Sequence, residues 1–255
     1  MIAEPRESPS RLLSPGDPEP LIVHNAGGSS SHVLVCDHSG RGIPGRLGAL
    51  GLRPEDLERH IAWDIGAGAL AVQLGRALDA CVVRQAYSRL VIDCNRWPGR
   101  EDLVPPVSDG TRIPANEGLS AEAVAERLAV IYAPYHAGIS AVIDTRLAVG
   151  RPVSVISVHS FTPVMNDVAR PWHVGVLHAG DSPLSNRLLA LLTAEDGLEV
   201  GDNQPYSLGE TDYTVPVHAQ RRGLDYLELE VRQDLIESAA GQARMAGLLA
   251  RLLQA

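Results

Sequence analysis

The chain has 255 residues, of which 45% are hydrophobic and 21% charged, and its formal net charge at pH 7 is -9. This length fits one large α/β domain or two small ones. The acidic balance argues against a nucleic-acid partner, which would need a basic face. No apolar run approaches the roughly 20 residues that cross a bilayer, the N-terminus lacks a hydrophobic signal core, and the cysteines lack the spacing of a disulfide framework. We therefore expect a cytoplasmic protein with reduced thiols that binds neither nucleic acid nor membrane; its oligomeric state stays open.

The order of apolar patterns along the chain predicts alternating strands and helices. Residues 1–20 are rich in proline, serine and charge, which indicates an extended arm before a single α/β domain at 21–255. Apolar runs predict strands at 33–36, 80–83, 90–92, 153–158, 173–177 and 224–231. Helical spacing predicts helices at 54–78, 120–149, 184–194, 211–222 and 234–253, and residues 97–119 are expected to form a long surface loop. Nearly all-apolar strands that alternate with helices are typical of a sheet covered on both faces.

Two arginines flank the expected strand at 90–92. Arg89 precedes it, and Asp93, Asn95 and Arg96 follow it. A guanidinium offers a rigid fork of donors that matches a carboxylate, so this pattern suits the binding of a carboxylate or an oxyanion. A structural ion pair between Asp93 and either arginine explains the same residues, and both interpretations remain open.

Further polar residues stand at the ends of other expected strands. His38 follows the first strand, His159 follows the strand at 153–158, and Glu230 ends the strand at 224–231. Two imidazoles and one carboxylate are a common ligand set of an open zinc site, and a second carboxylate can act as general base. Each histidine is equally well explained as a hydrogen-bonded turn residue. Of Glu228 and Glu230, we expect only one to face such a site.

Short segments in this chain resemble those of the zinc carboxypeptidases, in the same order along the chain. They are His-Ser at 38–39, Asp-Cys-Asn-Arg at 93–96, Val-His-Ser-Phe at 158–161 and Glu-Val-Arg at 230–232. Over roughly residues 30–240 the chain more closely resembles the N-formylglutamate amidohydrolase family. The stretches that carry this resemblance are 38–44, 63–67, 88–96, 135–136, 159–160 and 230–236.

The resemblance implies a three-layer α/β/α sandwich with a mixed, mostly parallel central sheet, like that of the zinc carboxypeptidases. It also implies metal-assisted hydrolysis of N-formyl-L-glutamate to glutamate and formate, a step in histidine breakdown. One position departs from the carboxypeptidase pattern, because Arg41 stands where that pattern has a glutamate ligand, and arginine does not bind zinc. Asp64 is the candidate replacement, although it could instead be a buried partner of Arg41 or Arg89; Asp37 is a lesser candidate.

The resemblance also implies a role for each site residue. One Zn²⁺ would be held by His38, His159 and Asp64, with Glu230 as general base. Arg89 would stabilise the oxyanion, Asn95 and Arg96 would hold a substrate carboxylate, and Arg232 would bind a second carboxylate or orient Glu230. The expected partner is a small anionic N-acyl dicarboxylic amino acid. A related N-acyl amino acid hydrolase or peptidase remains an alternative, as does a metal-free carboxylate-binding protein, which Arg41 favours.

Overall fold

The computed structural model describes residues 12–209 and 211–255. Residues 1–11 of the expected arm lie outside the described part of the chain. Residues 12–20 contain no helix or strand, but Leu12 is buried and the hydroxyl of Tyr87 donates to the carbonyl of Pro18 at 2.6 Å. This segment therefore packs against the body of the domain.

One mixed seven-stranded sheet forms the centre of the molecule, in the order β1-β3-β2-β6-β11-β9-β10. The inner strands β3, β2, β6 and β11 run parallel, whereas β1 is antiparallel to β3 and β9 is antiparallel to β11. The strands are β1 Leu21–His24, β2 His32–Cys36, β3 Cys81–Gln85, β6 Ser154–Phe161, β9 Val174–Leu177, β10 Val200–Asp202 and β11 Asp225–Arg232. The expected mixed, mostly parallel sheet is confirmed.

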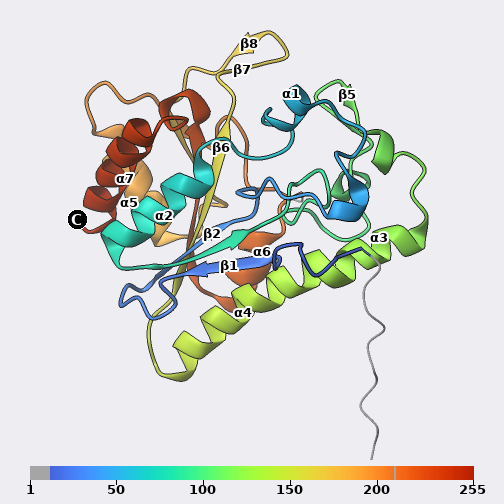
Figure 1. Cartoon of the computed structure of the whole chain (residues 1–255). Helices are drawn as coiled ribbons and strands as arrows, with labels where there is room; N and C mark the ends of the chain where they lie inside the picture. The colour runs from blue at the N-terminus through green and yellow to red at the C-terminus, as the bar shows by residue number, and fades with distance from the viewer. Residues whose placement is uncertain (1–11, 210) are drawn as a thin grey trace, which may run out of the picture.

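Helices cover both faces of this sheet (Figure 1). On one face lie α2 (Ala67–Leu78), α5 (Pro183–Thr193) and α7 (Ala239–Leu253), and on the other lie α4 (Ala133–Ala148) and α6 (Thr214–His218). Successive strand residues point to opposite faces. Leu34 therefore packs on the face covered by α2, α5 and α7, while Val33 and Val35 pack on the face covered by α4 and α6. Both layers are closed by aliphatic side chains, which confirms the three-layer sandwich.

The helix predicted at 54–78 is wrong in its middle part. A short helix, α1, occupies Pro54–Leu57, and α2 begins only at Ala67. Between them the chain turns at Gly66, which has a φ of +81° and lies so close to Ile236 that an added Cβ would meet its carbonyl oxygen at 2.2 Å. Only glycine fits this position. Asp64 therefore lies in a loop before α2 and not within a helix.

The strand predicted at 90–92 is also wrong, because these residues form a turn. The side chain of Ser88 accepts from the amide of Leu90. The carbonyl of Leu90 accepts from Asn116 at 2.8 Å, and that of Val91 accepts from Arg127 at 2.8 Å. Side chains thus satisfy the backbone groups that a neighbouring strand would otherwise pair. The apolar residues of the turn are buried all the same, which explains the strand-like pattern.

Other boundaries differ in ways that affect the site. β6 extends to Phe161 and β11 to Arg232, so His159 and Glu230 lie within strands. The helix predicted at 120–149 comprises α3 (Ala121–Arg127), a π-helical segment at Leu128–Tyr132 and α4. The loop at 97–119 contains the hairpin β4–β5 (Val107–Ser108 and Thr111–Arg112), and a second hairpin, β7–β8 (Val164–Met165 and Val168–Ala169), follows β6. The edge strands β1 and β10 were not predicted.

Within the described residues, no helix combines the length and the apolar character needed to cross a membrane. Cys36, Cys81 and Cys94 are buried free thiols.

Candidate functional site

A polar cavity lies at the carboxyl ends of the inner parallel strands, where ligands of α/β sheets usually bind. His38 follows β2 by two residues, and on the adjoining strands β6 and β11 His159 and Glu230 are direct neighbours in register. The cavity measures ≈ 180 Å³. Its walls combine basic and acidic side chains: His38, Asp64, Arg89, Asn95, Arg96, His159, Ser160, Leu177, Tyr206, Ser207, Thr211, Asp212, Glu228 and Glu230.

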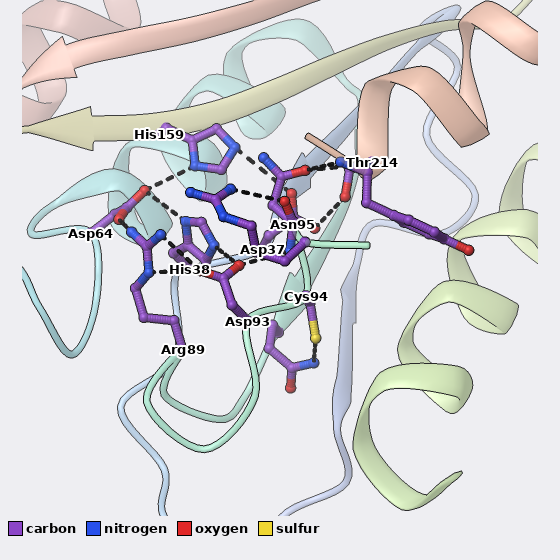
Figure 2. Close-up of polar contacts among 12 residues, drawn as sticks. Asp37, His38, Asp64, Arg89, Asp93, Cys94, Asn95, His159 and Thr214 are labelled. Atoms are coloured by element: carbon purple, nitrogen blue, oxygen red, sulfur yellow. Dashed lines mark hydrogen bonds and ion pairs between the residues drawn. The ribbon is translucent and has the colours of Figure 1, made fainter. Parts of the chain in front are cut away.

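Three of these side chains converge on one point (Figure 2). Asp64 Oδ2 lies 2.9 Å from His159 Nδ1 and 3.4 Å from His38 Nδ1. All three residues are buried, and they offer ligand atoms within 4.8 Å of one another. His38 Nδ1 has no hydrogen-bond partner among the described residues. Two imidazole nitrogens and a carboxylate oxygen in this arrangement could hold a metal ion.

The opposite nitrogen of each imidazole faces a protein acceptor. His38 Nε2 lies 2.7 Å from Asp93 Oδ1, and His159 Nε2 lies 2.9 Å from Ser157 Oγ. Metal-binding histidines generally donate their second N–H in this way, which fixes the ring and its tautomer. Both Nδ1 atoms are thereby directed toward Asp64.

The protonation states of Asp64, His38 and His159 depend on one another. Burial alone would raise the pKa of the Asp64 carboxyl, but the adjacent His38 and His159 hold it well below its usual range. Burial alone would lower the pKa of His159, but the hydrogen bond to Asp64 and its negative charge raise that pKa to about 10. In the absence of a metal, the cluster is therefore a carboxylate held between two imidazoles that favour the protonated form.

Arg89 lies beside the cluster and is fixed by Asp93. Its Nε and Nη2 donate to Asp93 Oδ2 at 3.0 and 2.7 Å, and its Nη1 lies 3.4 Å from Asp64 Oδ1. Asp93 is thus a structural ion-pair partner of Arg89, as one of the open interpretations of this segment predicted. Asp64 contacts both histidines and also Arg89, so its expected role as a buried partner of Arg89 is seen, and its role as a metal ligand stays a prediction.

Asn95 and Arg96 line the cavity but are partly engaged by the protein. Asn95 Oδ1 accepts from the amides of Tyr213 and Thr214 at 2.9 Å, and its Nδ2 donates to Asp212 at 3.2 Å. Arg96 Nε donates to Asp102 at 3.0 Å. Asn95 therefore anchors the start of α6, while Arg96 lines the cavity and is paired with Asp102.

Glu228 and Glu230 both line the cavity, so the expectation that only one of them would do so is wrong. Residues two apart on a strand share a face. Each glutamate has one buried oxygen, Oε2, without a hydrogen-bond partner in the described part of the chain. Burial is the main cause that raises the pKa of Glu230 to about 7, against the opposing charges of His159, His38 and Arg89.

Arg232 and Arg41 do not line the cavity. Arg232 pairs with Asp234 through Nε at 2.8 Å and donates to the carbonyl of Pro171 at 3.0 Å. Arg41 pairs with Glu58 at the surface, and its guanidinium lies over the ring of Trp63. Arg41 is thus no partner of the buried Asp64.

Sequence reasoning missed the residues that come from the segment between β10 and α6. Tyr206, Ser207, Thr211 and Asp212 line the cavity, yet this segment follows an edge strand that was not predicted. The Gly209 amide donates to Asp212 Oδ2 at 3.0 Å, and this short spacing could have marked a structured loop.

Comparisons with known proteins show the family and the fold. Residues 30–237 match the model of a protein family described as N-formylglutamate amidohydrolase. The crystal structure of a gene product from Agrobacterium tumefaciens has a TM-score of 0.92 and 37% sequence identity, over 96% of this chain and 97% of that one. The structure of N-formylglutamate amidohydrolase from Ralstonia eutropha JMP134 has a TM-score of 0.66 and 20% identity, over 92% and 95% of the two chains, and shows a shared fold. No protein of curated function matches the chain significantly.

Proposed function

Because the chain belongs to the N-formylglutamate amidohydrolase family, we propose that it is a zinc-dependent amidohydrolase of N-acyl, in particular N-formyl, acidic amino acids. The observation that carries this proposal is the convergence of His38 Nδ1, His159 Nδ1 and Asp64 Oδ2 in a cavity that also contains Glu230. This set provides metal ligands and a separate carboxylate for proton transfer in one place.

The residues present fit a metal ion. Each histidine turns Nε2 toward a protein acceptor, which leaves both Nδ1 atoms directed at Asp64. With Asp64 as the carboxylate ligand, the site does not need a glutamate at the position of Arg41. A Zn²⁺ held by His38, Asp64 and His159 would polarise the substrate carbonyl and lower the pKa of a water molecule.

Glu230 is the proposed general base. It faces the cavity one strand away from His159, and a carboxyl with a pKa of about 7 is suited to accept and return a proton near neutral pH. Glu230 takes a proton from the attacking water and then delivers it to the leaving nitrogen of the amide. Its unpartnered Oε2 is the oxygen available for this transfer.

Two arginines have the remaining proposed roles, at the oxyanion and at the substrate carboxylate. Arg89, held by Asp93 with Nη1 near Asp64, is the proposed partner of the oxyanion that develops at the carbonyl. Arg96 is the proposed partner of the substrate α-carboxylate. Asn95 positions Arg96 and the start of α6, since the backbone carbonyl of Asn95 accepts from Arg96 Nη1 at 2.9 Å.

The test is hydrolysis by the purified protein loaded with zinc. N-formyl-L-glutamate, N-acetyl-L-glutamate and a dipeptide with a C-terminal glutamate would be supplied in turn, and formate, acetate and free amino acid measured. We expect formate release from N-formyl-L-glutamate, abolished by a chelator and restored by zinc. Release from the acetyl compound or the dipeptide alone would assign the scaffold to a related N-acyl hydrolase or peptidase instead.

A further inference from the structure

The cavity has a buried end and an exposed mouth. Glu228 and Asp212 are 2% and 8% exposed, and both line the buried end together with Asn95. Tyr206 is 42% exposed and lines the same cavity, so it marks the mouth. Burial raises the pKa of Glu228 well above its usual range, and Asp212 accepts from Asn95 Nδ2 at 3.2 Å and from the Gly209 amide at 3.0 Å. Neither side chain offers a positive charge to a substrate carboxylate. Burying a charge without a partner is costly, so the second carboxylate of an acidic amino acid is better accommodated at the mouth than at the buried end.

The arginine expected to receive the second carboxylate of an acidic amino acid already has partners within the protein. Arg232 is engaged by Asp234 and by the carbonyls of Arg170 and Pro171, at 3.4 and 3.0 Å for the two carbonyls. Its guanidinium thus holds the backbone that follows the β7–β8 hairpin. The residue whose backbone it fixes is itself an arginine beside the mouth of the cavity.

Arg170 has the contacts of a guanidinium prepared for an anion. Its Nη1 donates to the hydroxyl of Tyr206 at 2.9 Å, and its guanidinium lies over the rings of Tyr206 at 4.9 Å and Phe161 at 6.0 Å. Among residues 12–209 and 211–255 it forms no ion pair with a carboxylate. By contrast, Arg89 and Arg96, which line the cavity, are already paired with Asp93 and Asp102.

We propose that Arg170, with the hydroxyl of Tyr206, binds the distal carboxylate of the substrate and so selects acidic amino acids. This inference rests on the proposed function for the class of substrate. The aromatic rings orient the guanidinium plane, and the two side chains offer donors on the exposed side of the cavity. A neutral amide at the same position would lose the charge-assisted hydrogen bonds.

The experiment compares L-glutamate with L-glutamine, which have the same length and differ in the charge of the distal group. Binding of each amino acid to the zinc-loaded protein would be measured by calorimetry for the wild type, Arg170→Gln and the matched surface control Arg244→Gln. We expect Arg170→Gln to weaken glutamate binding by roughly five- to tenfold and to leave glutamine binding unchanged. Arg244→Gln should bind both as the wild type does.

Equal affinity of the wild-type protein for both amino acids would overturn the proposal, as would an equal loss for both in Arg170→Gln. Unfolding transitions of the two variants are compared with that of the wild type, because a change in both affinities together with a lower transition would indicate a structural role and so also overturn it. These binding measurements need no turnover. Absence of formate release would therefore contradict the proposed reaction separately, without deciding the role of Arg170.

Discussion

Asp93 links His38 to Arg89 through one buried carboxylate. Oδ1 lies 2.7 Å from His38 Nε2, while Oδ2 accepts from Nε and Nη2 of the arginine. Burial alone would raise the pKa of Asp93, but Arg89 and His38 hold it well below its usual range. The carboxylate thus stays charged, directs His38 Nδ1 at Asp64, and sets the place of the proposed oxyanion partner relative to the proposed metal.

Replacing Asp93 by asparagine should therefore affect metal binding and catalysis together. The variant keeps the shape but loses the charge that orients His38, and we expect the zinc affinity to fall by roughly 10- to 100-fold. Competition with a chromophoric chelator would measure it, with the exposed Asp144→Asn as control. Zinc affinity equal to that of the wild type would show that His38 is not a ligand oriented by Asp93.

The zinc-dependent shift of the thermal unfolding transition tests the proposed set of metal ligands. A ligand that binds only the folded state stabilises it, by about 2.7 kcal/mol at a free concentration 100 times its dissociation constant. Zinc should accordingly raise the thermal transition of the wild-type protein. In His38→Ala, Asp64→Asn and His159→Ala the increase should be largely lost, and elemental analysis should find less bound zinc. An undiminished zinc-dependent shift in all three would place the metal elsewhere.

The sequence allowed the layers and most of this site to be predicted, and the errors have identifiable physical causes. Apolar runs located β2, β6 and β11, and the residues after them marked His38, His159 and Glu230. The apolar pattern could not show that residues 90–92 form a turn, because buried turns and buried strands have the same apolar side chains. The donors to the backbone carbonyls of this turn come from Asn116 and Arg127, which are distant in the sequence.

Contacts between distant segments explain the remaining differences. The helix was predicted to continue through Asp64 because no local pattern shows that Gly66 packs closely against Ile236. Tyr206 and Arg170 meet beside the mouth although they come from separate loops. The pairing of Arg232 with Asp234 is local, with a spacing of two residues, and could have been weighed against a role in substrate binding.

Glu230→Gln tests the assignment of the general base. The change preserves the shape of the side chain but removes its ability to accept a proton, so kcat for N-formyl-L-glutamate should fall by about 10²–10⁴. Zinc content should remain that of the wild type, because Glu230 is not among the three converging ligands. The exposed Glu199→Gln serves as control, and turnover within a factor of two of wild type in Glu230→Gln would assign proton transfer to another group.

Asn95→Ala should destabilise the protein even without substrate. The side-chain oxygen accepts from the amides of Tyr213 and Thr214 at 2.9 Å, and an unpaired buried amide costs about 1–3 kcal/mol. The free energy of unfolding measured in urea should drop by about 2–4 kcal/mol. Unchanged stability with weaker substrate binding would instead indicate that Asn95 acts mainly on the substrate.

A buried pair of histidines behind the cavity should make stability depend on pH. His136 Nε2 lies 2.9 Å from the carbonyl of Cys94, so this nitrogen donates, and His136 Nδ1 accepts from His218 Nε2 at 2.9 Å. His136 must be neutral to accept at Nδ1, whereas the Nε2 of His218 can donate whether or not that ring is protonated. Burial, reinforced by the other imidazole, lowers the pKa of His136 to about 3, and burial with the charge of Arg222 lowers that of His218 to about 4.

The sign of the effect follows from these depressed values. In the unfolded chain both imidazoles have a pKa near 6.5, so below that pH the unfolded state binds protons that the folded state does not. The stability that the pair contributes is complete above pH 6.5 and is lost as the pH falls toward 4. Each histidine adds a slope of about 1.4 kcal/mol per pH unit in that interval. In His218→Gln the free energy of unfolding, measured in urea from pH 7 to 4.5, should therefore decrease with a slope that is smaller by about this amount. A slope identical to that of the wild type would mean that His218 is not held neutral in the folded protein.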